Sequence, residues 1–96
     1  MAKSLPPEIE SDLSELILAV RELGFDPTGG SYEKQHFGNF VLDLQGPRKS
    51  VRVIRDRQQY FVDGSREELE PVGLFRAFDD KAEFGRSFLA WLGRGA

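Results

Sequence analysis

The sequence contains no cysteine and only one histidine, His36. A chain without cysteine has no disulfide framework and no thiolate metal ligand, a composition that suits a reducing compartment such as the cytoplasm. Any catalytic scheme with a histidine base would have to use His36, and no nucleophile motif accompanies it. The interval from His36 to Asp43 does not match a metal-ligand spacing either. We therefore expect no enzyme activity, no cofactor and no metal, with His36 structural or exposed to solvent.

Long apolar runs and a secretory leader are also lacking. No apolar stretch approaches the roughly 20 residues of a membrane-spanning helix. Residues 1–7 carry one lysine but no apolar core region follows them, so we interpret this segment as a flexible N-terminus and not as a signal peptide. Gly29 and Gly30 are not followed by the lysine and helix of a phosphate-binding loop. The sequence predicts a cytoplasmic protein without membrane contact.

The chain has enough apolar residues for one core. Its 96 residues are 40% hydrophobic, which predicts a single domain over 1–96, because so short a chain cannot enclose two cores. The net charge of −3 opposes a general role in coating nucleic acid. The charges are separated along the chain, since residues 1–26 are acidic and residues 48–57 are basic. The basic residues of that second stretch are Arg48, Lys49, Arg52, Arg55 and Arg57.

Two segments have the periodicity of amphipathic helices. Apolar residues recur at intervals of three and four over 8–23, which predicts one helix that ends at Gly24. Near the C-terminus, Asp80 is suited to cap a second helix over 80–92. The apolar face of this second helix consists of Phe84, Phe88, Trp91 and Leu92.

Between these helices the apolar period changes to two, which indicates β-strands. Strands over 39–45, 50–55 and 58–63 are predicted to form an antiparallel meander with short turns. Residues 26–31 contain a proline and paired glycines, so we expect a turn or flexible loop there. Residues 32–36 are a candidate short edge strand.

The segment after the third strand is less regular. Residues 64–71 are expected to form a connecting segment. Residues 72–78 fit either a short helix or a strand, with the helix preferred. The predicted fold is α+β: an N-terminal helix, a three- or four-stranded antiparallel β-meander and a C-terminal helix, with both helices on one face of the sheet.

The predicted turns set the register of the strands. A four-residue turn over 46–49 places Leu42 opposite Val53. A two-residue turn at Asp56 and Arg57 places Val53 opposite Tyr60. Two rows then occupy the outward face of the sheet. One row is Asp43, Arg52 and Phe61, and the other is Val41, Ile54 and Gln59.

The outward face combines charged and apolar side chains. In the predicted register, Arg52 forms an ion pair with Asp43 and lies over an aromatic ring. Its charge then interacts with groups of the sheet itself and not with a partner. Val41, Ile54 and Phe61 share this face, and soluble monomers seldom leave three such residues bare. Either the C-terminal segment covers them, or they contact a partner or a second copy of the chain.

Two functions are compatible with this face. The first is a noncatalytic protein-binding module that contacts a protein partner, or forms a homodimer, through the outward face and the basic turn. The predicted binding residues form an apolar centre and a charged rim: Val41, Ile54, Phe61, Arg48, Lys49 and Arg57. The alternative is a small nucleic-acid-contacting regulator or accessory protein that uses the basic hairpin at Arg48, Lys49, Arg55 and Arg57. The negative net charge favours the first function.

Three short segments carry a resemblance to known proteins. Residues 37–39 (FGN), 51–57 (VRVIRDR) and 61–63 (FVD), with Gln59 between the last two, resemble a group of small uncharacterised bacterial proteins. Some members of that group are similar to immunity proteins of toxin systems. The resemblance implies a small noncatalytic α+β protein of the immunity kind, and it places no active-site residue on this chain.

Overall fold

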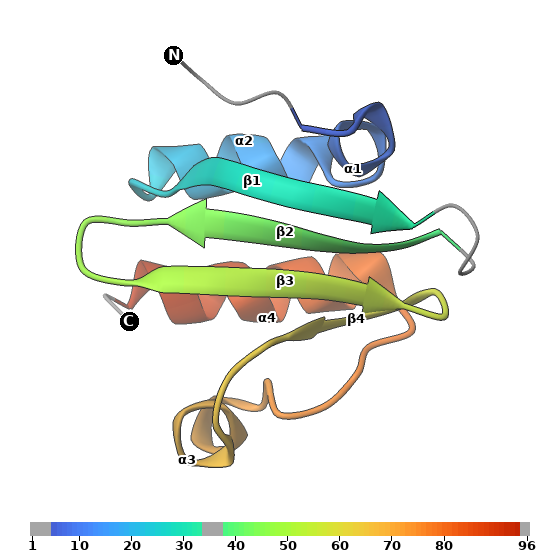
Figure 1. The fold of residues 1–96 in the computed structure, drawn as a ribbon. Coiled ribbons are helices and arrows are strands. Elements are labelled where there is room, and N and C mark those ends of the chain that lie inside the picture. Colours follow the sequence, from blue (N-terminus) through green and yellow to red (C-terminus); the bar gives the residue numbers. More distant parts are fainter. Residues whose placement is uncertain (1–4, 34–37, 95–96) are drawn as a thin grey trace.

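The computed structural model describes residues 5–33 and 38–94 (Figure 1). The elements in chain order are α1 (Pro7–Asp12), α2 (Ser14–Glu22), β1 (Asp26–Glu33), β2 (Asn39–Gln45), β3 (Ser50–Asp56), β4 (Gln59–Val62), α3 (Arg66–Leu69), the 3-10 turn η1 (Glu70–Val72) and α4 (Lys81–Gly93). The predicted α+β fold is confirmed, because the strands form an antiparallel meander in the order β1-β2-β3-β4 and helices pack on one face. In the described part of the chain, no helix is long and apolar enough to cross a membrane.

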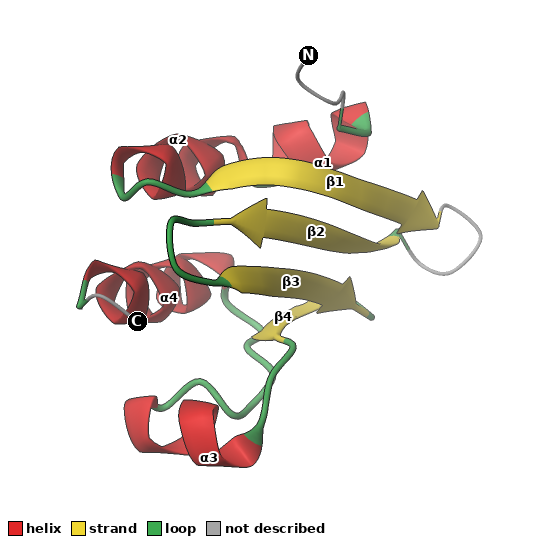
Figure 2. Ribbon diagram, turned by 60° about the vertical axis from the view of Figure 1, so that its left-hand side comes forward, coloured by secondary structure: helices red, strands yellow, loops and turns green. Residues whose placement is uncertain are grey.

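The helices lie against the apolar face of the sheet. In Figure 1, α2 lies behind β1 and α4 lies behind β3, and Figure 2 shows both helices along the same side of the sheet. The strand residues that face them are buried: Phe40, Leu42, Leu44, Val51, Val53, Tyr60 and Val62. The ring of Phe84 in α4 stacks on Tyr60, with centroids 5.9 Å apart, and on Phe88 at 5.4 Å. Burial of these rings contributes much of the apolar area that holds α4 on the sheet.

The β2–β3 register is as predicted, with Leu42 opposite Val53. The β3–β4 register is not. The turn residues are Arg57 and Gln58 instead of Asp56 and Arg57, so Val53 lies opposite Val62. Both turn residues have positive φ, 53° and 68°, as two-residue hairpin turns of type I′ require. The pairing is displaced by two positions, which keeps every β4 side chain on its predicted face.

Strand β1 corrects the sequence prediction, because the loop expected over 26–31 is paired along β2. An edge strand tolerates Pro27, since one side of the strand needs no amide for pairing. The register shifts between Pro27 and Gly29, as at a bulge. Gly30 lies beneath α1, and a Cβ there would be 2.9 Å from the carbonyl oxygen of Val41. Residues 34–36 of the candidate edge strand, His36 among them, lie outside the described residues.

The single helix expected over 8–23 is divided at Leu13, whose φ of −115° and ψ of 25° are not helical. The apolar stripe runs through this break without interruption, since Leu13 is itself buried. At the break, the carbonyl oxygen of Asp12 accepts a hydrogen bond from Nζ of Lys81 at 2.7 Å. Of the expected N-terminal segment, Leu5 is buried and residues 1–4 lie outside the described part.

The C-terminal helix is confirmed. Oδ1 of Asp80 accepts hydrogen bonds from the amides of Ala82 and Glu83 at 2.9 and 3.4 Å and so caps α4. The whole predicted apolar face of this helix is buried. Val72 ends η1, and residues 73–78 form neither the short helix nor the strand that their sequence suggested. They follow η1 irregularly until Phe78, which makes an isolated bridge to Tyr60 through two hydrogen bonds of 2.8 Å.

Candidate functional site

The helix-free face of the sheet carries side chains in rows that cross the strands. Its middle row consists of Val41, Ile54 and Phe61, which lie in direct register on β2, β3 and β4. We call these three residues the apolar row. All three side chains are partly exposed. The predicted register separated Phe61 from Ile54, whereas the observed register joins them.

One flanking row consists of Asp43, Arg52 and Asp63. Nε of Arg52 donates to Oδ1 of Asp43 at 2.7 Å, and Nη1 of Arg52 lies 3.8 Å from Oδ2 of Asp63. The hydrogen bond that Arg52 donates to Asp43, and then the charge of Asp43, raise the pKa of Arg52, so the guanidinium remains charged. The predicted Asp43–Arg52 pair is confirmed, but the third member of the row is Asp63 and not Phe61. The row therefore carries two carboxylates and one cation.

The row on the other side of the apolar row begins with Asn39 and Asp56. Nδ2 of Asn39 donates to Oδ1 of Asp56 at 3.0 Å. Gln59 lies opposite Asp56, and its Nε2 donates to Oδ1 of Asp79 at 2.7 Å. None of the ion pairs among the described residues includes Asp56 or Asp79. Amides therefore hold these two carboxylates in place and leave their charge unneutralised.

The predicted basic rim is not gathered beside the apolar row. Nζ of Lys49 pairs with Oε2 of Glu68 at 2.6 Å and lies 4.2 Å from the ring centroid of Trp91, on the helix side of the sheet. Arg48 is exposed in the turn between β2 and β3. Arg57 is exposed in the turn between β3 and β4. Arg48 and Lys49 thus lie at one end of β3, and Arg57 lies at the other end.

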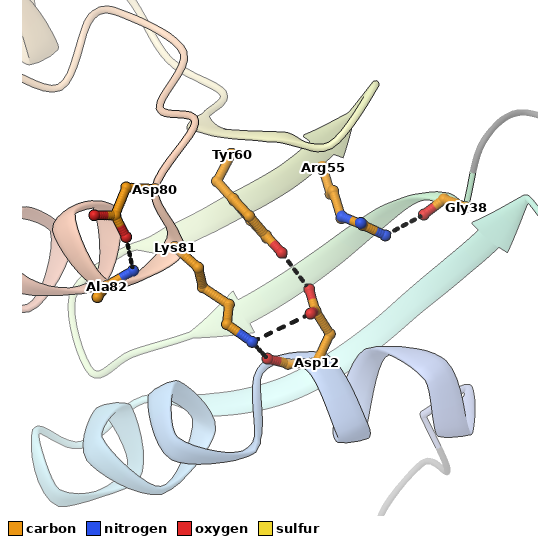
Figure 3. Close-up of polar contacts among 7 residues, drawn as sticks. All are labelled: Asp12, Gly38, Arg55, Tyr60, Asp80, Lys81 and Ala82. Carbon is orange, nitrogen blue, oxygen red and sulfur yellow. Dashed lines mark hydrogen bonds and ion pairs between the residues drawn. The ribbon is translucent and has the colours of Figure 1, made fainter.

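Arg55 is also directed away from the outward face. It lies in register with Phe40 and Tyr60, which both point into the core. Its Nη1 donates to the carbonyl oxygen of Gly38 at 3.2 Å, as Figure 3 shows. The guanidinium carbon lies 5.8 Å from the ring centroid of Tyr60. The basic stretch 48–57 therefore does not form one continuous cationic surface.

A second polar cluster joins α1, β4 and α4 on the helix side (Figure 3). Oη of Tyr60 donates to Oδ2 of Asp12 at 2.6 Å, and Nζ of Lys81 lies 3.3 Å from Oδ1 of the same carboxylate. Burial first, and then the Asp12 carboxylate, raise the pKa of Tyr60 to about 12. A phenol with so high a pKa is a weak acid near neutral pH. This cluster is suited to joining elements rather than to proton transfer.

Sequence reasoning missed the Asp12 cluster, because its members are 48 and 69 residues apart. In the sequence, Asp12 has the pattern of a solvent-facing helix position, and no local signal marks its partners. A groove of about 610 Å³ lies beside the cluster, between α2 and α4, with a mixed lining of apolar and charged side chains. Among the described residues, no three carboxylate or imidazole groups are placed to hold a metal ion.

Comparison of the chain with protein-family models, curated proteins and solved structures found no match.

Proposed function

We propose that the protein is a noncatalytic, cytoplasmic protein-binding module of the kind that toxin-immunity proteins represent. It binds its partner with the helix-free face of the sheet. The observation that carries this proposal is the apolar row, in which Val41, Ile54 and Phe61 stand in register on three adjacent strands.

The strand register brings the three side chains of the apolar row next to one another. Directly opposed side chains on an antiparallel sheet lie about 5 Å apart, so three in register make a continuous apolar strip about 10 Å long. Polar rows border the strip on both sides, which is the arrangement of an apolar centre within a polar rim. The core does not depend on this strip, because the helices pack on the opposite face.

The polar groups of the helix side support the noncatalytic part of the proposal. The hydroxyl of Tyr60 is engaged with Asp12, and the ammonium group of Lys49 is engaged with Glu68. These contacts tie elements of the fold to one another. A basic hairpin that contacts nucleic acid is less well supported, because Lys49 and Arg55 lie on the helix side.

The proposal is tested with a random peptide library displayed on phage and selected on the immobilised protein. Peptides enriched on the wild type should bind about tenfold more weakly to Ile54→Glu and Phe61→Ala, because each variant interrupts the apolar strip. Leu18→Glu is the matched control, since Leu18 is a 64% exposed apolar residue of α2, away from this face. Circular dichroism and thermal unfolding verify that each variant is folded.

Two outcomes would contradict the proposal. One is that the enriched peptides bind Ile54→Glu as tightly as the wild type. The other is saturable binding of oligonucleotides that weakens steeply with salt and is lost in Arg48→Ala with Arg57→Ala, which would favour the nucleic-acid function instead.

A further inference from the structure

We propose that the partner of the helix-free face is a polypeptide segment whose apolar side chains are bordered on both sides by lysine or arginine. This inference rests on the proposed function and adds the chemistry of the partner. It arises from the two charged rows that enclose the apolar row.

Carboxylates stand on both sides of the apolar row. Residues that share a face on one strand are two positions apart, or about 7 Å. Asp43 and Asp63 lie at this distance on one side of the row, in register with Arg52. Asp56 lies on the other side, and the Gln59 hydrogen bond adds Asp79 to it. The strip is therefore enclosed by negative charge.

The charge on this face is not balanced within the face. Arg52 is the cation of one row, and it lies between two carboxylates that remain 39% and 57% exposed. In the other row the donors to Asp56 and Asp79 are amides, which stabilise a carboxylate without neutralising it. On β2, β3 and β4 of the described structure, and with Asp79, the two rows hold four carboxylates and one guanidinium.

Among the described residues, Lys49 and Lys81 are paired away from this face, whereas Arg57 is exposed in the turn next to Asp56, at the end of that row. Lys49 pairs with Glu68 beside Trp91, and Lys81 contacts Asp12. A second copy of the chain would bring the same four carboxylates against this face, so like charges oppose self-association. Nucleic acid is disfavoured for the same reason. A basic polypeptide complements the face in both charge and apolarity.

Lysine and arginine also suit the dimensions of the face. Their long apolar stems can lie on Val41 or Phe61 while the charged group reaches an adjacent carboxylate row. Exposed ion pairs add little affinity individually. We therefore assign most of the affinity to the apolar row, and the choice of partner and the rate of association to the carboxylates.

The test uses four synthetic peptides of equal length. Three share one apolar stripe and differ only in its borders, which are lysine, serine or glutamate; the fourth keeps the lysines and replaces the apolar stripe with serine. Fluorescence anisotropy at low and physiological salt gives their dissociation constants. The lysine-bordered apolar peptide should bind about tenfold more tightly than its glutamate counterpart, and added salt should reduce the difference.

Matched variants separate charge from apolar contact. Asp56→Asn with Asp79→Asn should reduce the preference for lysine over glutamate about threefold, because two carboxylates become neutral amides of the same shape. Glu10→Gln with Glu22→Gln changes the charge equally in α1 and α2 and should keep the preference. Phe61→Ala should weaken all three peptides that carry the apolar stripe.

Equal affinity for the lysine and glutamate peptides, a preference that is unchanged in the Asp56 and Asp79 variant, or no binding of any peptide would overturn this inference. If the serine-bordered peptide still binds and loses affinity in Phe61→Ala, the proposed function stands without it. If the lysine-bordered apolar peptide binds Phe61→Ala and Ile54→Glu as tightly as the wild type, the proposed function itself fails.

Discussion

At the scale of single residues, Asp12 connects the most distant parts of the chain. Its carboxylate accepts from Tyr60 in β4, and both its carboxylate and its carbonyl oxygen contact Nζ of Lys81 in α4. The break at Leu13 places that carbonyl oxygen within reach of the lysine. The interruption in the N-terminal helix is therefore part of how the helical layer is joined to the sheet.

Tyr60→Phe should lower the free energy of unfolding at neutral pH by about 1–2 kcal/mol, because a hydrogen bond to a carboxylate is lost. The same variant should remove a component of alkaline denaturation. The folded protein holds the phenolic proton up to a pKa of about 12, whereas the unfolded chain releases it near the usual value of 10.0. The contribution of Tyr60 is thus fully present below pH 10 and is lost as the pH rises toward 12.

Urea unfolding of the wild type and of Tyr60→Phe across this pH range measures the effect. Lysines also titrate in the same range, so the difference between the two proteins is the informative quantity. That difference should shrink as the pH rises from 10 to 12. A difference that stays constant would show that the Tyr60 hydroxyl titrates normally.

At the scale of elements, the turn between β3 and β4 has an unfavourable local conformation. Arg57 and Gln58 both adopt positive φ, where a side chain with a Cβ is disfavoured by about 1–2 kcal/mol. The amide of Arg57 donates to Oδ1 of Asn39 at 2.8 Å, which helps to hold the turn in place. The pairing of the strands therefore outweighs the preference of the turn residues.

Gln58→Gly should stabilise the protein by about 1 kcal/mol, because glycine adopts positive φ without steric conflict. Thermal unfolding should show an increase in the midpoint of about 4–8 °C for a domain of this size. Gln59→Gly is the matched control. This neighbouring residue lies in β4, where glycine weakens a strand, so the midpoint should fall. An equal shift in both variants would contradict the explanation from positive φ.

The elements differ in how far the sequence determined them. The alternation of Leu42 and Leu44 with polar residues was sufficient to place β2, and its register with β3 followed from the short turn. The β3–β4 register was wrong by two residues because neither Arg57 nor Gln58 is a glycine or asparagine that would mark the turn. Strand β1 was missed because edge strands tolerate the residues that otherwise indicate loops, such as Pro27.

The candidate site was partly predictable for related reasons. Alternation alone placed Val41, Ile54 and Phe61 on the outward face. The three residues lie in one row only in the observed β3–β4 register. The predicted register was displaced by two residues and therefore did not show this row. Asp79 was not recognisable from sequence, because an irregular segment brings it to Gln59, 20 residues away along the chain.

At the scale of the whole molecule, the sheet has a protected centre and a less protected edge. Strands β2 and β3 pair on both sides, whereas β1 pairs only with β2. The side chains of Leu42 and Val53 are fully buried beneath the helices. The centre of the sheet should therefore open only when the domain unfolds.

Hydrogen exchange followed by nuclear magnetic resonance tests this arrangement. We expect the amides of Leu42 and Val53 to exchange at rates set by global unfolding. Those β1 amides that bond to β2 should exchange faster, because the edge can separate without opening the core. Equal protection of β1 and β3 would mean that the edge strand and the core unfold as one unit.

The order of the strands also has a kinetic consequence. Each strand pairs with the strand next to it in the chain, so every pairing closes a short loop and requires little loss of chain entropy. The contacts of Asp12 with Tyr60 and Lys81 close loops of 48 and 69 residues. We therefore expect the meander to form from its turns before the two ends of the chain meet, with the contacts of Asp12 forming later. Contacts that form late in folding act mainly on the rate of unfolding, which makes the Asp12 cluster a determinant of how long the folded state lasts rather than of how quickly it is reached.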